Sequence, residues 1–363
     1  MLLLFIPIGI TVNLAEKIDK MLANEVPFSE VAIYYLNFTI YFANLLFPLF
    51  LFLSVIWFTS KLANNTEIVA FLGEKKSIIG RSHECDYPRD LNNIVKLTSP
   101  KINVDGTSGE IDKQINTILE NSLSVYKVDV EKLKNLDPDF IVTQAHCEVC
   151  AVSFSEVEDI VCKHLNQKTK IISLQPNTLG EVFDDIRRVA NDLKVDNVMS
   201  NKLIKSLKIR LENIKHKTLN LKRKPTIACI EWIDPLMIAG NWIPEMVTIS
   251  GGIDIFGKPG KNSYWVKFNE IKNHDPDIII FLPCGFDIKK TEKELDNLLK
   301  RDSIWSTLKA FKNKKLFVAD GNQFFNRPGP RLIESIEIFA EIIHPELFNF
   351  KHEKKGWINF INN

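Results

Sequence analysis

The feature that most constrains the fold is a short internal repeat. The text VEKLKNLDPDFIV at residues 130–142 returns as FNEIKNHDPDIII at residues 268–280, a separation of 138 residues. In each copy an amphipathic helix ends at a proline, Pro138 or Pro276, and an apolar strand follows. The repeat predicts two related lobes, because a period this long does not fit a solenoid. Chance recurrence of a common helix-to-strand junction is the alternative.

Beyond residue 70, short apolar runs alternate with helical patterns, which is typical of an α/β protein with largely parallel sheets. The predicted strands are Phe140–Gln144, Lys170–Leu174, Thr226–Glu231, Ile278–Leu282 and Lys315–Ala319. Thr178 is the predicted N-cap of a helix with a 3.6-residue apolar stripe. The long helical stretch over 178–223 is basic in its second half. That basic surface indicates a solvated helix face or contact with an acidic partner or a membrane.

The first 60 residues differ in composition from the rest of the chain. No charged residue occurs from Val31 to Ser60, and about 20 apolar residues are enough to span a bilayer. We therefore predict a membrane helix hairpin in the N-terminal segment 1–64, with a full span at about 38–59 and a partial span at 1–14. A buried core helix is the alternative for the full span. The lysines that follow favour the cytoplasmic face for the C-terminal part.

The overall charge and the cysteines exclude several classes of protein. The 363 residues include 46 basic and 45 acidic side chains and carry a formal net charge of +1, so we expect no nucleic-acid partner. Six cysteines without a pairing framework fit a reducing compartment. The sequence has no nucleophile elbow, Walker loop or HExxH motif, so we expect a protein that is not an enzyme.

Two family resemblances divide the chain. Residues 1–70 resemble the start of the lipopolysaccharide-export permease family, through text that runs from LAEKIDKM to NNTEIVAFL. They cover only the first two spans of that six-span family. Residues 65–350 resemble the periplasmic-binding-protein family for cobalamin and iron-siderophores, and within it the cobalamin-binding subgroup. The matching text includes GRSHECDYP, VTQAHCEVCAVS, ACIEWIDPLMIAGNWIPEMV, LPCGFD and DGNQFFNRPGPRLIESIEIFAEIIHPELF.

The second resemblance implies two doubly wound α/β lobes joined by a long helix, with a ligand in the cleft between them. It implies a substrate-binding protein for cobalamin, a related corrinoid or a metal chelate, which needs no cofactor and feeds an ABC permease. Family analogy places such a protein in the periplasm, here anchored to a membrane by its N-terminal segment. The implied division is lobe 1 at 65–177, a connecting helix at 178–223, lobe 2 at 224–350 and a tail at 351–363.

The junction between the two resemblances is unusual. They overlap on Thr66-Glu67-Ile68-Val69, where the binding family has an apolar strand just upstream. Here the apolar permease-like segment stands in that place. The first strand of lobe 1 is therefore either missing or replaced by Ser54–Thr59. A gene-fusion product without a transport role is an alternative interpretation of the whole chain.

The candidate ligand site follows from the chemistry of a corrinoid, which has apolar faces fringed with amides. Its cleft needs aromatic walls and neutral hydrogen-bonding groups, placed after strand ends where open α/β sheets bind ligands. For each tryptophan, a place in the core is the alternative. Arg327 is the candidate for binding a phosphate or carboxylate, and capping of its own loop is the alternative. The candidate residues are His83, Cys85, Cys147, Cys150, Trp232, Asn241, Trp242, Trp265, Cys284, Asn322, Gln323, Phe325, Asn326 and Arg327.

A second constellation consists of soft and imidazole ligands, namely His83, Cys85, His146, Cys147 and Cys150. Such groups bind cobalt, iron or zinc, so the alternative function is a metal-ion or iron-chelate binding protein. The Cys-x-x-Cys pair has no second pair at the spacing of a zinc site. Buried thiols and hydrogen-bonded histidines are the structural alternative.

The family resemblance also implies docking on a permease through one carboxylate per lobe. Glu131, seven residues before Pro138, matches the position in lobe 1. Asn269 stands at the corresponding position in lobe 2, with Glu270 beside it. Glu131 and Glu270 are therefore the candidate docking residues, and ordinary exposed helix residues are the alternative.

Overall fold

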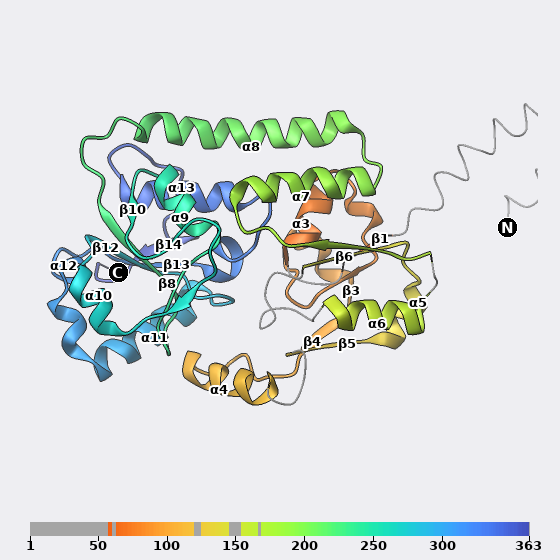
Figure 1. The fold of residues 1–363 in the computed structure, drawn as a ribbon, viewed down its shortest axis with the longest axis horizontal. Coiled ribbons are helices and arrows are strands. Elements are labelled where there is room, and N and C mark those ends of the chain that lie inside the picture. The colour runs from red at the N-terminus through yellow and green to blue at the C-terminus, as the bar shows by residue number, and fades with distance from the viewer. Residues whose placement is uncertain (1–56, 60–62, 120–124, 145–153, 166–167, 363) are drawn as a thin grey trace, which may run out of the picture. The chain divides into compact units, whose positions relative to one another are not determined.

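The structure is a computed structural model that describes residues 57–59, 63–119, 125–144, 154–165 and 168–362 (Figure 1). The chain divides into two compact units, Met1–Val55 and Ile56–Asn363, and the described residues all belong to the second. Below, lobe 1 denotes the described residues up to 177 and lobe 2 the described residues from 224.

The predicted membrane spans at 1–14 and 38–59 lie outside the described residues, except for Trp57–Thr59. Those three residues form strand β1, so the span prediction is wrong there. Strand β1 pairs in parallel with β6 (Phe140–Gln144), with Phe58 opposite Ile141. The strand expected upstream of the family motif is therefore present. Within the described part of the chain, no helix combines the length and apolarity needed to cross a bilayer.

Lobe 1 is built on the parallel sheet β1-β6-β7, where β7 is Lys170–Leu174 as predicted. Two short pairs lie beside it, the parallel pair β2–β3 and the antiparallel pair β4–β5. The remaining elements are α3 (Ala63–Phe71), η1 (Lys75–Ser77), β2 (Gly80–Arg81), η2 (Arg89–Asn93), β3 (Val95–Lys96), β4 (Thr98–Pro100), α4 (Ser108–Leu119), β5 (Tyr126–Val128), α5 (Val130–Leu136) and α6 (Phe154–His164).

Lobe 2 contains a seven-stranded sheet in the order β11-β9-β8-β12-β13-β14, with β10 also paired to β8. The three predicted strands of this lobe are β8 (Thr226–Trp232), β12 (Ile278–Phe281) and β13 (Leu316–Ala319). The other strands are β9 (Met237–Ile238), β10 (Ile253–Asp254), β11 (Tyr264–Trp265) and β14 (Trp357–Asn359). The helices are α9 (Ile243–Ile249), α10 (Phe268–His274), α11 (Ile288–Arg301), η3 (Ser303–Thr307), α12 (Lys309–Lys312), η4 (Gly321–Phe325) and α13 (Leu332–Ile343).

The described residues of the C-terminal segment, 351–362, are part of lobe 2 rather than a separate tail. Its strand β14 pairs antiparallel with β13, placing Ile358 opposite Val318. The indole of Trp357 is buried and donates to Glu341 of α13 over 2.8 Å. The segment therefore closes one edge of the lobe 2 sheet.

The internal repeat corresponds to the same local structure in both lobes. Helix α5 ends at Asp137 with φ of 40°, and α10 ends at Asp275 with φ of 41°, each in the left-handed region. In both copies a proline follows, and the chain then enters a central strand, β6 or β12. The flanking strands are parallel in both, so β1-β6-β7 matches β8-β12-β13. The repeat therefore corresponds to the same helix-to-strand junction and the same order of parallel strands in two sheets.

The predicted connecting helix over 178–223 consists of two helices, α7 (Leu179–Asp192) and α8 (Asn197–Thr218). Thr178 caps α7 in a capping box with Glu181, as expected. The chain turns at Lys194, which has φ of 55°, and Asp196 caps α8. The single-helix prediction was wrong because an apolar stripe does not reveal where the chain turns back. Helix α8 lies along α7 and reaches α13 of lobe 2 (Figure 1).

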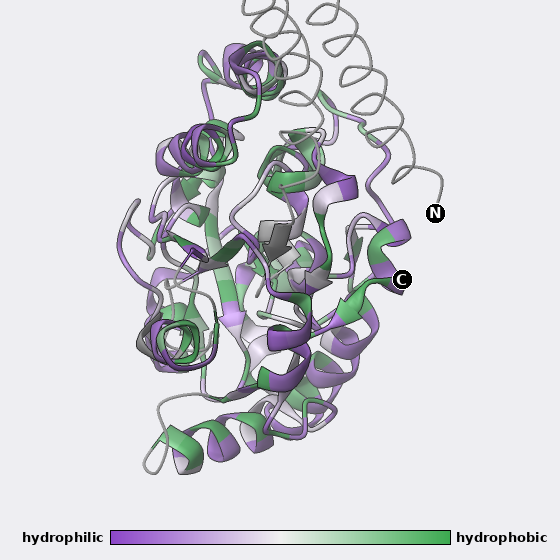
Figure 2. Cartoon of the chain, turned by 90° about the vertical axis from the view of Figure 1, so that its right-hand side faces the viewer, coloured by the Kyte–Doolittle hydropathy of each residue, from purple (hydrophilic) through white to green (hydrophobic). Residues whose placement is uncertain are grey.

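The core follows the faces of the two sheets. The largest apolar cluster joins α3, α7 and α8 to the α9 and α13 side of lobe 2. A second cluster fills the opposite face of the lobe 2 sheet around the fully buried Trp305. A smaller one lies between β6 and α6 in lobe 1. Figure 2 shows hydrophobic and hydrophilic residues side by side along the helices, as expected of elements that bury one face.

Candidate functional site

The carboxyl ends of the parallel strands of lobe 2 bring several predicted site residues to one edge of the sheet. Trp232 ends β8, Cys284 follows β12 and Asn322 follows β13. Such an edge is where open α/β sheets bind ligands. The Trp232 ring lies 5.2 Å from that of Phe286, and the Trp232 side chain also contacts Ile111 of lobe 1. This edge therefore meets lobe 1 through an aromatic pair.

Arg327, the predicted anion-binding residue, forms an ion pair between the lobes. Its guanidinium is 5% exposed and lies 2.5 Å from a carboxylate oxygen of Asp86 in lobe 1. It also donates to the side chain of Asn322 over 2.8 Å and to the backbone oxygen of Glu84 over 3.3 Å. Burial would lower the pKa of Arg327, but the carboxylate of Asp86 raises it above its ordinary value. The guanidinium thus has a carboxylate partner within the chain.

The predicted soft ligands are only partly within the described residues. His83 shares a 2.7 Å hydrogen bond with Thr98, and its ring lies 5.2 Å from Tyr126. Burial raises the pKa of the Cys85 thiol to about 11, so this sulfur is a protonated thiol near neutral pH. His146, Cys147 and Cys150 lie outside the described residues. The described ranges hold no group of three or more His, Cys, Asp or Glu arranged to hold a metal ion. Metal ligation by this set stays a prediction.

Several predicted wall residues are buried and brace the loop after β13. The Trp242 indole donates to the backbone oxygen of Phe325 over 2.8 Å, and Phe325 is fully buried against Phe339. Asn326 donates to two backbone oxygens, and Gln323 bonds to the carboxylate of Asp320. These contacts shape the π-helical turn η4. Trp242 is therefore buried in the core, which is the alternative stated above for each tryptophan.

Three other predicted residues lie at different positions in lobe 2. Trp265, on β11, is 55% exposed. Asn241 adopts a left-handed conformation with φ of 53°. Cys284 is half-buried, and its backbone N–H donates to Glu231 over 3.1 Å. The structure therefore brings Trp232, Asn322 and Arg327 to the lobe interface, places Cys284 beside β8 and leaves Trp265 on the surface.

The candidate docking carboxylates occupy equivalent helices. Glu131 lies in the first turn of α5, has a side chain 80% exposed and pairs with Lys134 over 2.9 Å. Glu270 lies in the first turn of α10 and accepts from the backbone N–H of Lys267 over 2.8 Å. Both carboxylates are on the surface, and Glu270 also stabilises the start of its own helix.

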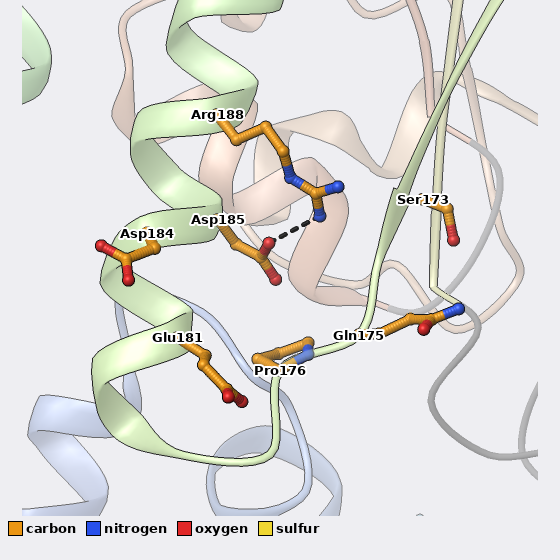
Figure 3. Close-up of a pocket in the computed structure, with 7 residues that line it drawn as sticks. All are labelled: Ser173, Gln175, Pro176, Glu181, Asp184, Asp185 and Arg188. Carbon is orange, nitrogen blue, oxygen red and sulfur yellow. Dashed lines mark hydrogen bonds and ion pairs between the residues drawn. The ribbon is translucent and has the colours of Figure 1, made fainter.

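A pocket of about 390 Å³ lies in lobe 1 at the carboxyl end of β7 (Figure 3). Its volume is near the small end of ligand sites, about 300–1,000 Å³. Arg188 extends from α7 into the space beside β7 and bonds to Asp185 of the same helix over 2.6 Å. Burial raises the pKa of Asp185, whereas Arg188 opposes that shift. The lining residues are Ser173, Gln175, Pro176, Glu181, Asp184, Asp185 and Arg188. The pocket is thus small and charged, unlike an aromatic corrinoid wall.

Sequence reasoning missed the residues through which the two lobes meet. Glu67 and Arg331 form a buried ion pair, with 2.9 Å from the Arg331 Nε to the Glu67 carboxylate. Burial raises the pKa of Glu67, and Arg331 opposes the shift. Phe286 and Ile111 complete the aromatic contact of Trp232. No local pattern marks these residues, because the contacts that cross between the lobes, such as Glu67–Arg331 and Ile111–Trp232, join residues more than 100 positions apart.

Comparison with protein families gives two matches. The family described as "Periplasmic binding protein" matches residues 63–322. The family described as "Lipopolysaccharide export system permease LptF/LptG" matches residues 1–72. Both resemblances drawn from the sequence are thereby confirmed. The two matches overlap over residues 63–72, which contain α3.

Individual relatives are distant. The uncharacterized ABC transporter substrate-binding lipoprotein YvrC of Bacillus subtilis is 23% identical over 296 residues, which is 80% of each chain. The periplasmic vitamin B12 binding protein BtuF of Vibrio cholerae superposes with a TM-score of 0.58 at 16% identity, covering 80% of this chain and 98% of its own. The periplasmic heme-binding protein RhuT of Roseiflexus gives a TM-score of 0.59 at 16% identity, covering 80% and 99%. These structural likenesses show the fold.

Proposed function

The chain belongs to the periplasmic binding protein family, and from that premise we propose that it binds a large metal chelate between its lobes without chemical turnover. A corrinoid is the first candidate ligand. The observation that carries the proposal is the aromatic pair Trp232 and Phe286, at the strand ends of lobe 2 and facing lobe 1. A flat macrocycle stacks well on such a surface, and neutral Asn322 lies on the same edge.

The names of the structural relatives support a flat ring as ligand. One is described as a vitamin B12 binding protein and another as a heme-binding protein. Corrin and heme are both tetrapyrrole-type macrocycles that carry a metal. The small pocket at β7 is lined by three carboxylates and one arginine, which suits neither macrocycle.

Calorimetric titration of the full chain with cyanocobalamin, hemin and a ferric siderophore tests the proposal. We expect micromolar or tighter binding of one macrocycle. Trp232→Ala should weaken it tenfold or more, because loss of a buried aromatic contact costs about 1.5–3 kcal/mol. Phe350→Ala, which removes an exposed aromatic side chain elsewhere in lobe 2, is the control. A folded chain that binds none of the three probes would refute the proposal.

The proposed partner is an ABC permease, and the exposed carboxylates Glu131 and Glu270 are the proposed contacts. Glu131→Arg should reduce ligand uptake by cells while leaving ligand affinity unchanged, because its side chain is exposed and its ion-pair partner is Lys134 of the same helix. Lys132→Glu on the same helix is the control for a charge change. Anchoring through the N-terminal segment is part of the proposal. Retention of the chain in carbonate-washed membranes, and its release on deletion of residues 1–55, would support it.

A further inference from the structure

Helix α4 belongs to the connection between two strands of lobe 1, and it packs on lobe 2. The chain leaves β4, forms α4, and returns to β5, which pairs antiparallel with β4. In Figure 1, α4 lies below the strands of lobe 2, on the side opposite α8. Lobe 2 is therefore reached from two sides, by α8 along one and by α4 along the other.

The apolar side of α4 is buried on the aromatic edge of lobe 2. Ile111 is 5% exposed and forms one cluster with Trp232 and Phe286. Ile115, one turn later on the same face, packs against that cluster, as do Ile102 and Met237. Figure 2 shows green and purple residues interspersed along this helix, at the bottom of the view. The surface proposed to receive the ligand is thus covered by α4.

Polar contacts hold the start of α4 in place. The backbone N–H and the hydroxyl of Ser108 both donate to one carboxylate oxygen of Glu294, over 2.9 and 2.7 Å. The ammonium of Lys290 donates to the backbone oxygen of Val104 over 2.5 Å and lies 3.9 Å from the centre of the Phe286 ring. Both lobe 2 residues come from α11. These contacts form a latch of few bonds at one end of the helix.

The contact leaves one polar group unsatisfied. The indole N–H of Trp232 is buried and has no hydrogen-bond partner among the described residues. A buried donor without a partner destabilises the arrangement that buries it. A ligand bearing an amide or carboxylate oxygen would satisfy this donor, whereas the apolar face of α4 does not.

We infer that α4 is a displaceable lid, which covers Trp232 and Phe286 in the free protein and leaves them when the ligand binds. The inference rests on the proposed function, because it takes the aromatic pair as the ligand wall. The lid and the ligand compete for one surface, so anything that holds α4 down weakens binding. Anything that loosens the Ser108–Glu294 latch strengthens it.

A disulfide between α4 and lobe 2 tests the competition. A Cβ placed on Gly109 lies 3.9 Å from the Cβ of Asp234, which is within the range that a disulfide spans. The full chain carrying Gly109→Cys and Asp234→Cys should bind macrocycle at least tenfold more weakly when oxidised, and reduction should restore binding. Wild type and the Asp234→Cys single variant, taken through the same redox steps, are the controls. Equal affinity in the oxidised and reduced double variant would overturn the lid.

A second measurement needs no ligand. Glu294→Gln removes the charge from the latch, so amides of α4 should exchange hydrogen at least tenfold faster while β4 and β5 keep their protection. Asp296→Asn, an exposed carboxylate on the same helix, is the matched control. Unchanged exchange in α4 overturns the lid, as does faster exchange throughout lobe 1. If no macrocycle binds wild type, the proposed function fails, and this exchange result alone still decides whether α4 detaches.

Discussion

Lobe 1 and lobe 2 each contain three equivalent parallel strands, but the strands differ in length and in what pairs with their outer edges. In lobe 2, the first strand β8 has seven residues, and the outer edge of the third strand is covered by β14. In lobe 1, β1 has three residues, and the third strand β7 pairs on one side only within the described part of the chain. The comparison indicates that the repeated helix-to-strand motif sets the strand arrangement of each lobe. The elements packed beside those strands determine how stable each lobe is.

Lobe 1 depends on contacts that cross to lobe 2. Glu67 pairs with Arg331, Asp86 pairs with Arg327, and α4 packs on Trp232. Lobe 2 has a complete apolar cluster of its own around Trp305. We therefore expect lobe 2 to be the more stable lobe, with lobe 1 opening first.

The largest loss of folding stability is expected from a change in the buried ion pair between the lobes, Glu67 and Arg331. Glu67→Ala leaves the guanidinium of Arg331 buried without its carboxylate, and both side chains are almost fully inaccessible. Loss of one partner of such a pair costs about 3–5 kcal/mol. Urea unfolding of the full chain should show this loss, whereas Glu131→Ala, at an exposed pair, should cost about 0–1 kcal/mol. Equal effects of the two variants would show that the lobes do not depend on this pair.

The repeat supplies a matched pair for testing the asymmetry directly. Ile141 in β6 and Ile279 in β12 stand at equivalent positions and are both fully buried. Truncation of either to alanine should cost about 2–5 kcal/mol of local stability. Hydrogen exchange should show Ile141→Ala speeding exchange in β6 and β7 alone. Ile279→Ala should speed exchange in both lobes, and the reverse pattern would break the comparison.

A pH effect should appear in lobe 2. Burial raises the pKa of Glu231 to about 7, in spite of the hydrogen bond from Ser263. Because the folded state favours the protonated acid, its stabilisation is complete below pH 4.5, the ordinary value, and is lost as the pH rises through 7. Between pH 5 and 8, wild type should lose about 1–3 kcal/mol relative to Glu231→Gln. If the stability of wild type and of Glu231→Gln changed equally with pH, ionisation of Glu231 would not be the cause of the effect.

The smallest loss of folding stability is expected at the N-terminus of α7, which follows lobe 1. Thr178→Ala removes the side-chain acceptor of the capping box on α7, which typically costs about 1 kcal/mol. Thermal unfolding should show a correspondingly small loss. Thr117→Ala, on the exposed side of α4, is the control without a capping role. A loss as large as that of Glu67→Ala would mean that α7 stabilises both lobes.

Much of this fold follows from local pattern. The five predicted strands agree with the structure to within one residue at each end, because apolar runs bounded by turns need no distant partner to be recognised. Prediction was wrong at Trp57–Thr59, where an apolar run suited both a membrane helix and a buried strand. Pairing with β6 makes it a strand. The turn between α7 and α8 was missed for a similar reason, since the apolar stripe continues across it.

The residues of the candidate site also divide into those that local sequence pattern predicted and those that only the tertiary structure brought together. The sequence by itself determined the α/β plan with its repeated helix-to-strand motif and placed Trp232, Asn322 and Arg327 at or after strand ends, because periodicity and strand order are local properties. Only the tertiary structure decided that Asp86 neutralises Arg327 and that Ile111 of α4 covers Trp232. Those contacts join residues more than 100 positions apart, and their energies depend on burial, which exists only after the lobes have packed.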